Sequence, residues 1–156
     1  MHAGSSLELR VPPVVIALVA ALCMWLLSRW IPGLEWSRTW RLGTGLLLLA
    51  AGLLVAVTGV LEFRRARTTV NPTTPQATSS MVRSGIYRHT RNPMYLGMLL
   101  VLTGWAVWLA NPAAAALLPA FFLYINRFQI EPEERILAGL FAGEFDAYRR
   151  SVRRWL

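Results

Sequence analysis

Lysine is absent from this 156-residue chain, and cysteine, aspartate and histidine are scarce. The single cysteine, Cys23, cannot form an internal disulfide, and with only two distant histidines, His2 and His89, it cannot complete a zinc site. The single aspartate, Asp146, argues against two-metal or aspartate-rich magnesium chemistry. We therefore expect a protein without a bound metal.

The charges that are present are strongly biased toward one sign. All 16 basic residues are arginines, against eight acidic residues, which gives a formal net charge of +8. Such an excess fits either nucleic acid or an anionic membrane surface as a partner, and the distribution of the charges decides between them. Hydrophobic residues make up 55% of the sequence, above the roughly 45–50% usual in soluble domains. The length favours a single domain.

Long stretches of the chain carry no charge. Runs of 18 and 20 uncharged residues follow Arg10 and Arg41. A transmembrane helix needs about 20 apolar residues. These two runs therefore predict single membrane spans at about 12–28 and 43–61.

The longest uncharged run has 35 residues, between Arg91 and Arg127. As one helix it would be about 52 Å long, too long for a single crossing. Its middle contains Asn111-Pro112, a turn signal with a proline that favours a helix start. We therefore predict a tight helical hairpin with arms at about 94–110 and 113–126. Together the runs predict an all-α integral membrane protein with about four transmembrane helices.

The arginines also predict an orientation in the membrane. With four spans, Arg29, Arg38 and Arg41 lie on one side and the other 13 of the 16 arginines on the opposite side. The positive-inside rule places that second side, with both termini, in the cytoplasm. The other cytoplasmic parts are a loop at 64–91, irregular in its middle, and a charged amphipathic helix at 131–156. Contact with membrane lipids explains the basic charge without any nucleic acid.

Two short segments border the predicted hairpin, residues 85–97 before it and 126–134 after it. Because a hairpin returns the chain to the leaflet it left, we expect both segments side by side at the cytoplasmic surface. Each segment has an ordinary structural explanation: Asn92 and Pro93 form a helix cap and a first-turn proline, and the glutamates of 131–134 favour a helix start. The arginines there would equally hold lipid headgroups.

Taken together, the two segments favour a ligand site. Exposed N–H groups at helix starts bind carboxylates or phosphates. The pair Glu133 and Glu134, beside Arg91 and Arg127, can hold an ammonium group while an arginine holds an anion. Such a pocket suits a zwitterionic, partly apolar ligand.

The same segments resemble a known family. The residues that carry the resemblance are Gly85-x-Tyr87, Arg91-Asn92-Pro93-Met94-Tyr95-Leu96-Gly97, Glu133-Glu134-x-x-Leu137, Phe141 and Tyr148. Over residues 68–156, this pattern is similar to the isoprenylcysteine carboxyl methyltransferase and phospholipid methyltransferase superfamily. The resemblance implies a single membrane domain over 1–156 that uses S-adenosylmethionine to methylate a lipophilic acceptor at the cytoplasmic membrane face.

The resemblance also implies roles for individual residues. The glutamates would take the ammonium group or the ribose hydroxyls of the cofactor. Arg127 would orient an anionic acceptor or the cofactor carboxylate, and the sequence does not decide between it and Arg91. The catalytic set is Arg127, Glu133 and Arg91. The cofactor-binding set is Tyr87, Arg91, Asn92, Pro93, Met94, Tyr95, Gly97, Glu133 and Glu134.

The sequence departs from the family pattern at two positions. Asn92 stands where the family usually has histidine, and Ala142 stands where it usually has a glycine that we expect to be structural. A separate glycine motif, Gly43-Thr44-Gly45, falls at the outer end of the second span. We assign it to close helix packing, together with Gly52 and Gly59.

Three alternatives stay open beside the main interpretation. A phospholipid N-methyltransferase belongs to the same superfamily, and a membrane reductase of similar helical fold would use NADPH. A non-enzymatic protein would bind anionic lipid through its basic loop. The all-arginine, alanine- and tryptophan-rich composition suggests a high-GC bacterium, so we expect the inner (plasma) membrane. Acceptor candidates are a phospholipid amine, a prenyl or quinone-like molecule, and a thiol.

Overall fold

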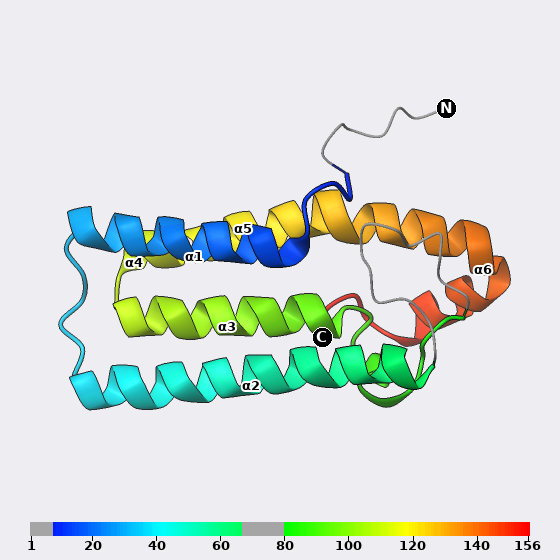
Figure 1. Cartoon of the computed structure of the whole chain (residues 1–156), viewed down its shortest axis with the longest axis horizontal. Coiled ribbons are helices and arrows are strands. Elements are labelled where there is room, and N and C mark those ends of the chain that lie inside the picture. Colours follow the sequence, from blue (N-terminus) through cyan, green and yellow to red (C-terminus); the bar gives the residue numbers. More distant parts are fainter. Residues whose placement is uncertain (1–7, 67–79) are drawn as a thin grey trace.

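The computed structural model describes residues 8–66 and 80–156, and every regular element within these ranges is a helix (Figure 1). The predicted all-α class is therefore confirmed. The middle of the predicted loop at 64–91, residues 67–79, lies outside the described residues. The elements in chain order are α1 (Pro13–Trp30), α2 (Arg38–Arg65), η2 (Gly85–Arg88), α3 (Pro93–Leu109), α4 (Pro112–Ala115), α5 (Leu117–Ile125), the π-helical segment η3 (Asn126–Ile130) and α6 (Glu131–Ser151).

Helices α1 and α2 match the two predicted single spans and present apolar surfaces to their surroundings. Leu18, Leu47 and Leu54 expose 64%, 69% and 66% of their surface. Contiguous exposed apolar surface of this kind marks a membrane-facing flank in a helical protein. Helix α2 starts earlier than predicted because the Ser37 side chain caps it, accepting a hydrogen bond from the Trp40 N–H at 3.2 Å.

The predicted hairpin is confirmed. Helix α3 ends at Leu109, Ala110 adopts a left-handed conformation with a φ of 48°, and Asn111 caps α4. The cap is a hydrogen bond from the Ala114 N–H to the Asn111 side-chain oxygen at 3.0 Å. The Asn111 amide nitrogen also donates to the Ile31 carbonyl at 2.7 Å, which ties this turn to the end of α1.

The helix lengths agree with an integral membrane protein. Helices α1 and α2, and the 40-residue stretch that runs from α4 through α6, are long and apolar enough to cross a membrane. Helix α3 is a shorter apolar helix of 17 residues and forms the first arm of the hairpin. Three helical stretches thus have spanning length by themselves, and α3 packs among them.

Helices α2 and α3 approach each other through glycines. Gly52 faces Gly97 so closely that a β-carbon on either residue would lie 2.6 Å from the carbonyl oxygen of the other. A β-carbon on Gly104 would likewise lie 2.8 Å from the Gly45 carbonyl oxygen. Gly59 meets the start of α3, where a β-carbon on this glycine would lie 3.1 Å from the nearest side-chain atoms. The prediction that Gly45, Gly52 and Gly59 serve close helix packing is confirmed.

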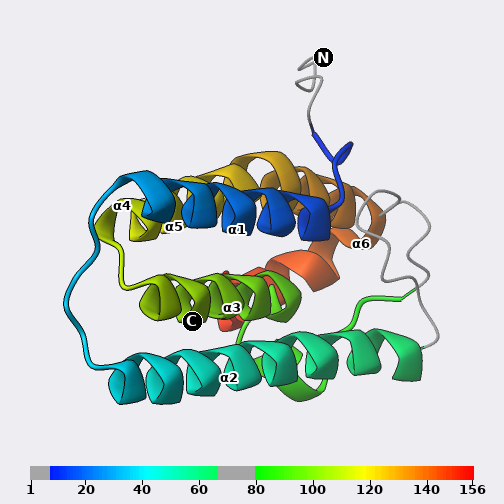
Figure 2. The same cartoon turned by 60° about the vertical axis from the view of Figure 1, so that its left-hand side comes forward.

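Helix α6 is shorter than the helix predicted at 131–156. Ala142 has a φ of 21° and a ψ of −105°, which kinks the helix, and α6 ends at Ser151. The last five residues run back toward the start of α3, where the Arg91 N–H donates to the Arg153 carbonyl at 3.0 Å (Figure 2). The predicted helix was therefore wrong for 152–156, because this tail pairs its backbone with the residues before α3.

The hairpin gives the molecule two distinct ends (Figures 1 and 2). One end holds the α1–α2 connection and the α3–α4 turn, where the Arg41 Nε donates to the Trp108 carbonyl at 2.8 Å. The other end holds the start of α1, the end of α2, the start of α3, and α6. The buried polar side chains found at this second end are Glu62, Thr90, Asn92 and Gln129.

Candidate functional site

The starts of α3 and α6 meet at this polar end. The Tyr95 hydroxyl, in the first turn of α3, donates a hydrogen bond to Glu133, in the first turn of α6. Just before α3, the Arg91 guanidinium pairs with Glu134 at 2.8 Å. The two pairs are separated by 38 and 43 residues in the sequence. The predicted juxtaposition of the two segments is therefore confirmed, and the hairpin is what produces it.

Arg91 is held by several contacts inside the protein. Its side chain is 10% exposed, with Nη2 on Glu134 and Nη1 donating to the carbonyls of Arg149 and Val152 at 3.0 and 2.7 Å. Its Nε is buried and has no hydrogen-bond partner among residues 8–66 and 80–156. Arg91 thus joins α6 and the tail to the start of α3, and its Nε–H is left without a partner in the described part of the chain.

A second arginine on Glu134, Arg154, was missed by the sequence analysis. Its Nη2 and Nε lie 2.6 and 3.3 Å from the two carboxylate oxygens of Glu134, a bidentate arrangement. The Arg154 carbonyl accepts hydrogen bonds from the Asn92 side-chain amide at 2.9 Å and from the Thr90 hydroxyl at 3.3 Å. A straight helix to the C-terminus would have carried Arg154 away from Glu134, so the predicted helix hid this contact.

Trp155 anchors the tail to the returning arm of the hairpin. Its indole N–H donates to the Asn126 side-chain oxygen at 3.1 Å. Its ring packs on Phe122, with the ring centroids 4.8 Å apart. The last residues of the chain therefore form one wall of the site.

Tyr87 lies in the short helix η2 and is 4% exposed. Its carbonyl accepts a hydrogen bond from the Tyr148 hydroxyl at 2.7 Å, and its ring packs edge-on against Phe63 with centroids 5.4 Å apart. The Tyr87 hydroxyl itself is buried without a hydrogen-bond partner in the described part of the chain. Burial raises the pKa of Tyr87 far above its usual range, so this hydroxyl stays protonated. A buried donor without a partner is costly, and it indicates a place for a ligand atom.

Glu62 holds η2 against the end of α2. The Ser84 hydroxyl donates to the Glu62 carboxylate, and Arg65 pairs with it at 2.8 Å. Gly85 has a φ of +55°, and a β-carbon there would lie 2.6 Å from the Glu62 carboxylate. Glycine suits this position, because a positive φ is unfavourable for a residue with a β-carbon and a β-carbon would crowd the Glu62 carboxylate.

Asn92 occupies the cap position of α3, but its side chain does not cap the helix. The amide reaches the tail instead, and the Asn92 N–H donates to the Thr90 hydroxyl at 3.1 Å. The expected side-chain cap by Asn92 is therefore wrong. Pro93 and Met94 lie against a glycine of α2, and Gly97 packs on α2 as described above. The structure thus gives these three residues of the predicted cofactor-binding set contacts in helix packing.

Arg127 is not brought to the glutamate pair. It is exposed, and its Nη1 lies 2.8 Å from Glu8 and 3.8 Å from Glu131. None of the contacts made by Arg127 among the described residues involves Glu133 or Glu134. Its role in orienting a ligand stays a prediction.

Gln129 faces inward from the same segment and is fully buried. Its amide nitrogen donates to the Val11 carbonyl at 3.0 Å, while its amide oxygen has no partner within 8–66 and 80–156. The residue lies in η3, and π-helical turns are frequent at functional sites. The sequence carried no signal for it, because the hydrophobic pattern does not distinguish a π-helical turn from an α-helical one.

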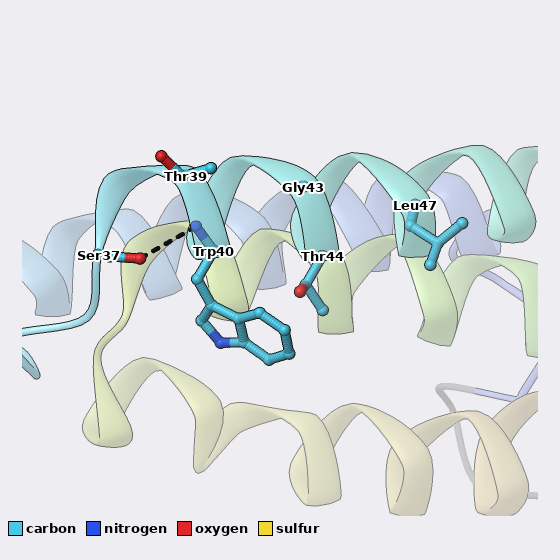
Figure 3. A pocket seen from close by; sticks show the side chains of 6 residues that line it. All are labelled: Ser37, Thr39, Trp40, Gly43, Thr44 and Leu47. Carbon is cyan, nitrogen blue, oxygen red and sulfur yellow. Dashed lines mark hydrogen bonds between the residues drawn. The ribbon is translucent and has the colours of Figure 1, made fainter.

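A hollow of about 450 Å³ lies at the opposite end of the molecule, along the start of α2 (Figure 3). A β-carbon on Gly43 would meet nothing within 4 Å, so the expectation that Gly43 serves helix packing was wrong. None of the lining residues is charged, and the hollow is a depression in an apolar flank. The residues that line it are Ser37, Thr39, Trp40, Gly43, Thr44 and Leu47.

The fold and the site define an all-helical integral membrane protein with a charged, partly buried site where two helix starts meet. The sequence matches the phospholipid methyltransferase family over residues 40–144, which is more than half of the chain. The chain therefore belongs to the phospholipid methyltransferase family.

The chain is also similar in sequence to individual proteins. The chain is 29% identical over 124 residues to protein-S-isoprenylcysteine O-methyltransferase A of Arabidopsis thaliana, covering 78% of this chain and 61% of that protein. It is 30% identical over 111 residues to a probable protein-S-isoprenylcysteine O-methyltransferase of Oryza sativa subsp. japonica, covering 69% of this chain and 56% of that protein. An uncharacterized protein of Haemophilus influenzae is 46% identical over 63 residues, which are 40% of this chain and its own full length. The chain thus spans less than two thirds of the plant relatives.

Proposed function

We propose that the protein is a membrane methyltransferase that uses S-adenosylmethionine to methylate a lipophilic acceptor at the cytoplasmic membrane face. Family membership and the names of the plant relatives support methyl transfer. The observation that carries the proposal is the junction of α3 and α6. There Tyr95 meets Glu133, and Arg91 meets Glu134, close in the chain to the buried, unpartnered hydroxyl of Tyr87 in η2.

The residues at this junction fit the chemistry of S-adenosylmethionine. The amino-acid end of that molecule carries an ammonium group and a carboxylate, and the junction offers both acidic and basic side chains. The adenosyl end is partly apolar and carries hydroxyl and ring-nitrogen acceptors. Two buried donors without partners in the described ranges, the Tyr87 hydroxyl and the Arg91 Nε, suit such acceptors.

The side chains of the site act by binding and positioning. When bound, the donor supplies a methyl group on a cationic sulfur, and an acceptor lone pair takes the methyl carbon as the carbon–sulfur bond breaks. A displacement of this kind depends on alignment and exclusion of water more than on strong acid–base assistance. Glu133, held by Tyr95, offers a carboxyl group to a cationic group of the donor, and the helix starts keep these groups in place.

The acceptor reaches the site from the membrane. The exposed apolar flanks of α1 and α2 face lipid, so a lipophilic molecule would enter laterally between helices and needs no aqueous tunnel. The arginine distribution supports a cytoplasmic location of the site in a bacterial inner membrane. The family name favours a phospholipid as acceptor, and the names of the plant relatives favour an oxygen atom of an isoprenylated cysteine.

A binding experiment on the purified full chain in detergent tests the proposal. We expect equilibrium dialysis to show binding of labelled S-adenosylmethionine and none of NADPH. Tyr87→Phe should weaken this binding about tenfold, because it removes one hydrogen bond to the ligand. The same change should leave the melting temperature unaltered, since the hydroxyl has no partner among the described residues.

The alternatives predict other outcomes of the same experiment. Binding of NADPH in place of S-adenosylmethionine would favour the reductase, and binding of neither would favour a non-enzymatic lipid-binding protein. Incubation with methyl-labelled donor and fractionated membrane lipids then identifies the acceptor class. Label that stays on a non-volatile head group after mild alkali would indicate amine methylation, whereas label released as volatile methanol would indicate a methyl ester.

A further inference from the structure

Glu134 is shared by two arginines whose surroundings differ. The Arg91 side chain is 10% exposed and is tied to two carbonyls besides the carboxylate. The Arg154 side chain is 36% exposed, and its guanidinium contacts Glu134 through Nε and Nη2. Its Nη1 makes no hydrogen bond to any residue of the described ranges. Arg154 is therefore the arginine of this pair that can turn toward a ligand without dismantling the site.

We propose that Arg154 is the residue that binds the carboxylate of the methyl donor. The inference rests on the proposed function. The sequence did not decide whether Arg91 or Arg127 binds the carboxylate, and the structure favours a third arginine. Arg91 would have to leave three internal partners to take this part. Arg127 is engaged with Glu8 and Glu131.

The charges of the junction support this assignment. Two guanidinium groups share Glu134, which leaves one positive charge in excess, while Glu133 is bound by the neutral hydroxyl of Tyr95 and has no cationic partner among the described residues. A surplus positive group and a carboxyl group without a counter-ion, which meet at the first turn of α6, complement a zwitterion. The planar guanidinium binds a carboxylate through two parallel hydrogen bonds, so Arg154 suits the anionic end and Glu133 the cationic end.

The backbone around Arg154 is fixed before any ligand arrives. Its carbonyl accepts from Asn92 and Thr90, and the next residue, Trp155, is anchored to Asn126. The backbone of Arg154 is therefore held in place, while its guanidinium group is partly exposed. Such preorganisation lowers the entropic cost of holding a ligand group.

The test compares S-adenosylmethionine with its decarboxylated analogue, which lacks only the carboxylate. We expect the wild-type chain to bind S-adenosylmethionine at least about tenfold more tightly, the discrimination typical of a charge-assisted contact. Arg154→Gln should abolish this preference while binding of the analogue is unchanged, and Arg154→Lys should keep part of it. Arg153→Gln is the matched control, because that neighbouring side chain is exposed, and it should retain the full preference.

The ratio of the two affinities does not depend on the fraction of protein that is folded. If Arg154→Gln weakens both ligands equally, Arg154 is structural and the proposal is wrong. Equal affinities of the wild-type chain for S-adenosylmethionine and its decarboxylated analogue would also overturn the proposal. A preference for S-adenosylmethionine that persists in Arg154→Gln would overturn it as well. Absence of binding of either ligand to the wild-type chain would instead contradict the proposed function.

Discussion

At the scale of single residues, Glu133 and Glu134 are neighbours with different partners. Glu134 balances Arg91 and Arg154, whereas Glu133 accepts a hydrogen bond from the neutral Tyr95. Only Glu134 has to be negative to offset a neighbouring guanidinium in the folded state. The two glutamates should therefore respond differently to the same isosteric change.

We predict that Glu134→Gln lowers stability by about 2 kcal/mol, because it leaves the largely buried Arg91 guanidinium without its counter-charge. Part exposure of the cluster keeps the loss below that of a fully buried pair. Glu133→Gln should cost less than about 1 kcal/mol, since an amide oxygen still accepts from Tyr95, yet it should weaken binding of S-adenosylmethionine. Thermal unfolding in detergent and equilibrium dialysis measure the two effects. Equal melting temperatures for both variants would contradict the assigned partners.

Ala142 is the second residue whose environment leads to a prediction. Its φ of 21° is costly for any residue with a β-carbon, and it lies at the kink of α6. Ala142→Gly should therefore raise stability by about 1 kcal/mol. The control is Ala138→Gly in the same helix, at a position without a kink, which should lower stability by about the same amount. A decrease in melting temperature for both variants would show that the kink carries no strain.

Single residues of the site were predictable where they belong to a local motif. Glu133 was found because it lies in the first turn of a predicted helix that the hairpin brings to the start of α3, and Tyr95 was found through the family resemblance. Arg154 and Gln129 were not found. The first depends on a tail that reverses direction, and the second on a π-helical turn, and neither feature has a periodic hydrophobic signature.

At the scale of elements, the contact between α2 and α3 decides how the site is held. Gly52 and Gly97 allow the two backbones to touch, and this contact sets the position of the start of α3. The hydropathy of the chain predicted the existence of these helices, because uncharged runs of spanning length leave little choice. Their ends were less predictable, since caps such as Ser37 and kinks such as Ala142 depend on single residues.

Substitutions in α2 separate packing from helix propensity. Gly52→Ala should destabilise the protein by about 2 kcal/mol, because its β-carbon would lie 2.6 Å from the Gly97 carbonyl oxygen. Gly43→Ala, in the same helix, should stabilise it by up to about 1 kcal/mol, because nothing lies within 4 Å and alanine favours the helix. Melting temperatures in detergent measure both changes. The two melting temperatures should shift in opposite directions. A loss of stability in Gly43→Ala would mean that another part of the protein packs against the start of α2.

At the scale of the whole molecule, the site exists because one turn reverses the chain. The turn at Ala110 and Asn111 lies at the opposite end from the site, and it is tied to the end of α1 through Ile31. It returns the chain to the end where α3 began, so that the starts of α3 and α6 meet. The uncharged run and its Asn-Pro turn signal were enough to predict this topology. The orientation in the membrane is predicted separately, from the arginine bias.

Labelling of single cysteines tests topology and orientation together. The variants are made in a Cys23→Ala background. His89→Cys lies before α3, and Arg150→Cys lies near the end of α6. We predict that both cysteines react with an impermeant maleimide only after the inner membrane is opened. Cysteine at Trp36, between α1 and α2, should react in intact spheroplasts. All three positions are exposed, so differences in labelling report the side of the membrane and not burial. The reversed pattern would change the orientation and leave the site intact. Labelling of positions 89 and 150 from opposite sides would separate Arg91 from Glu134, and neither the site nor the function proposed for it could then stand.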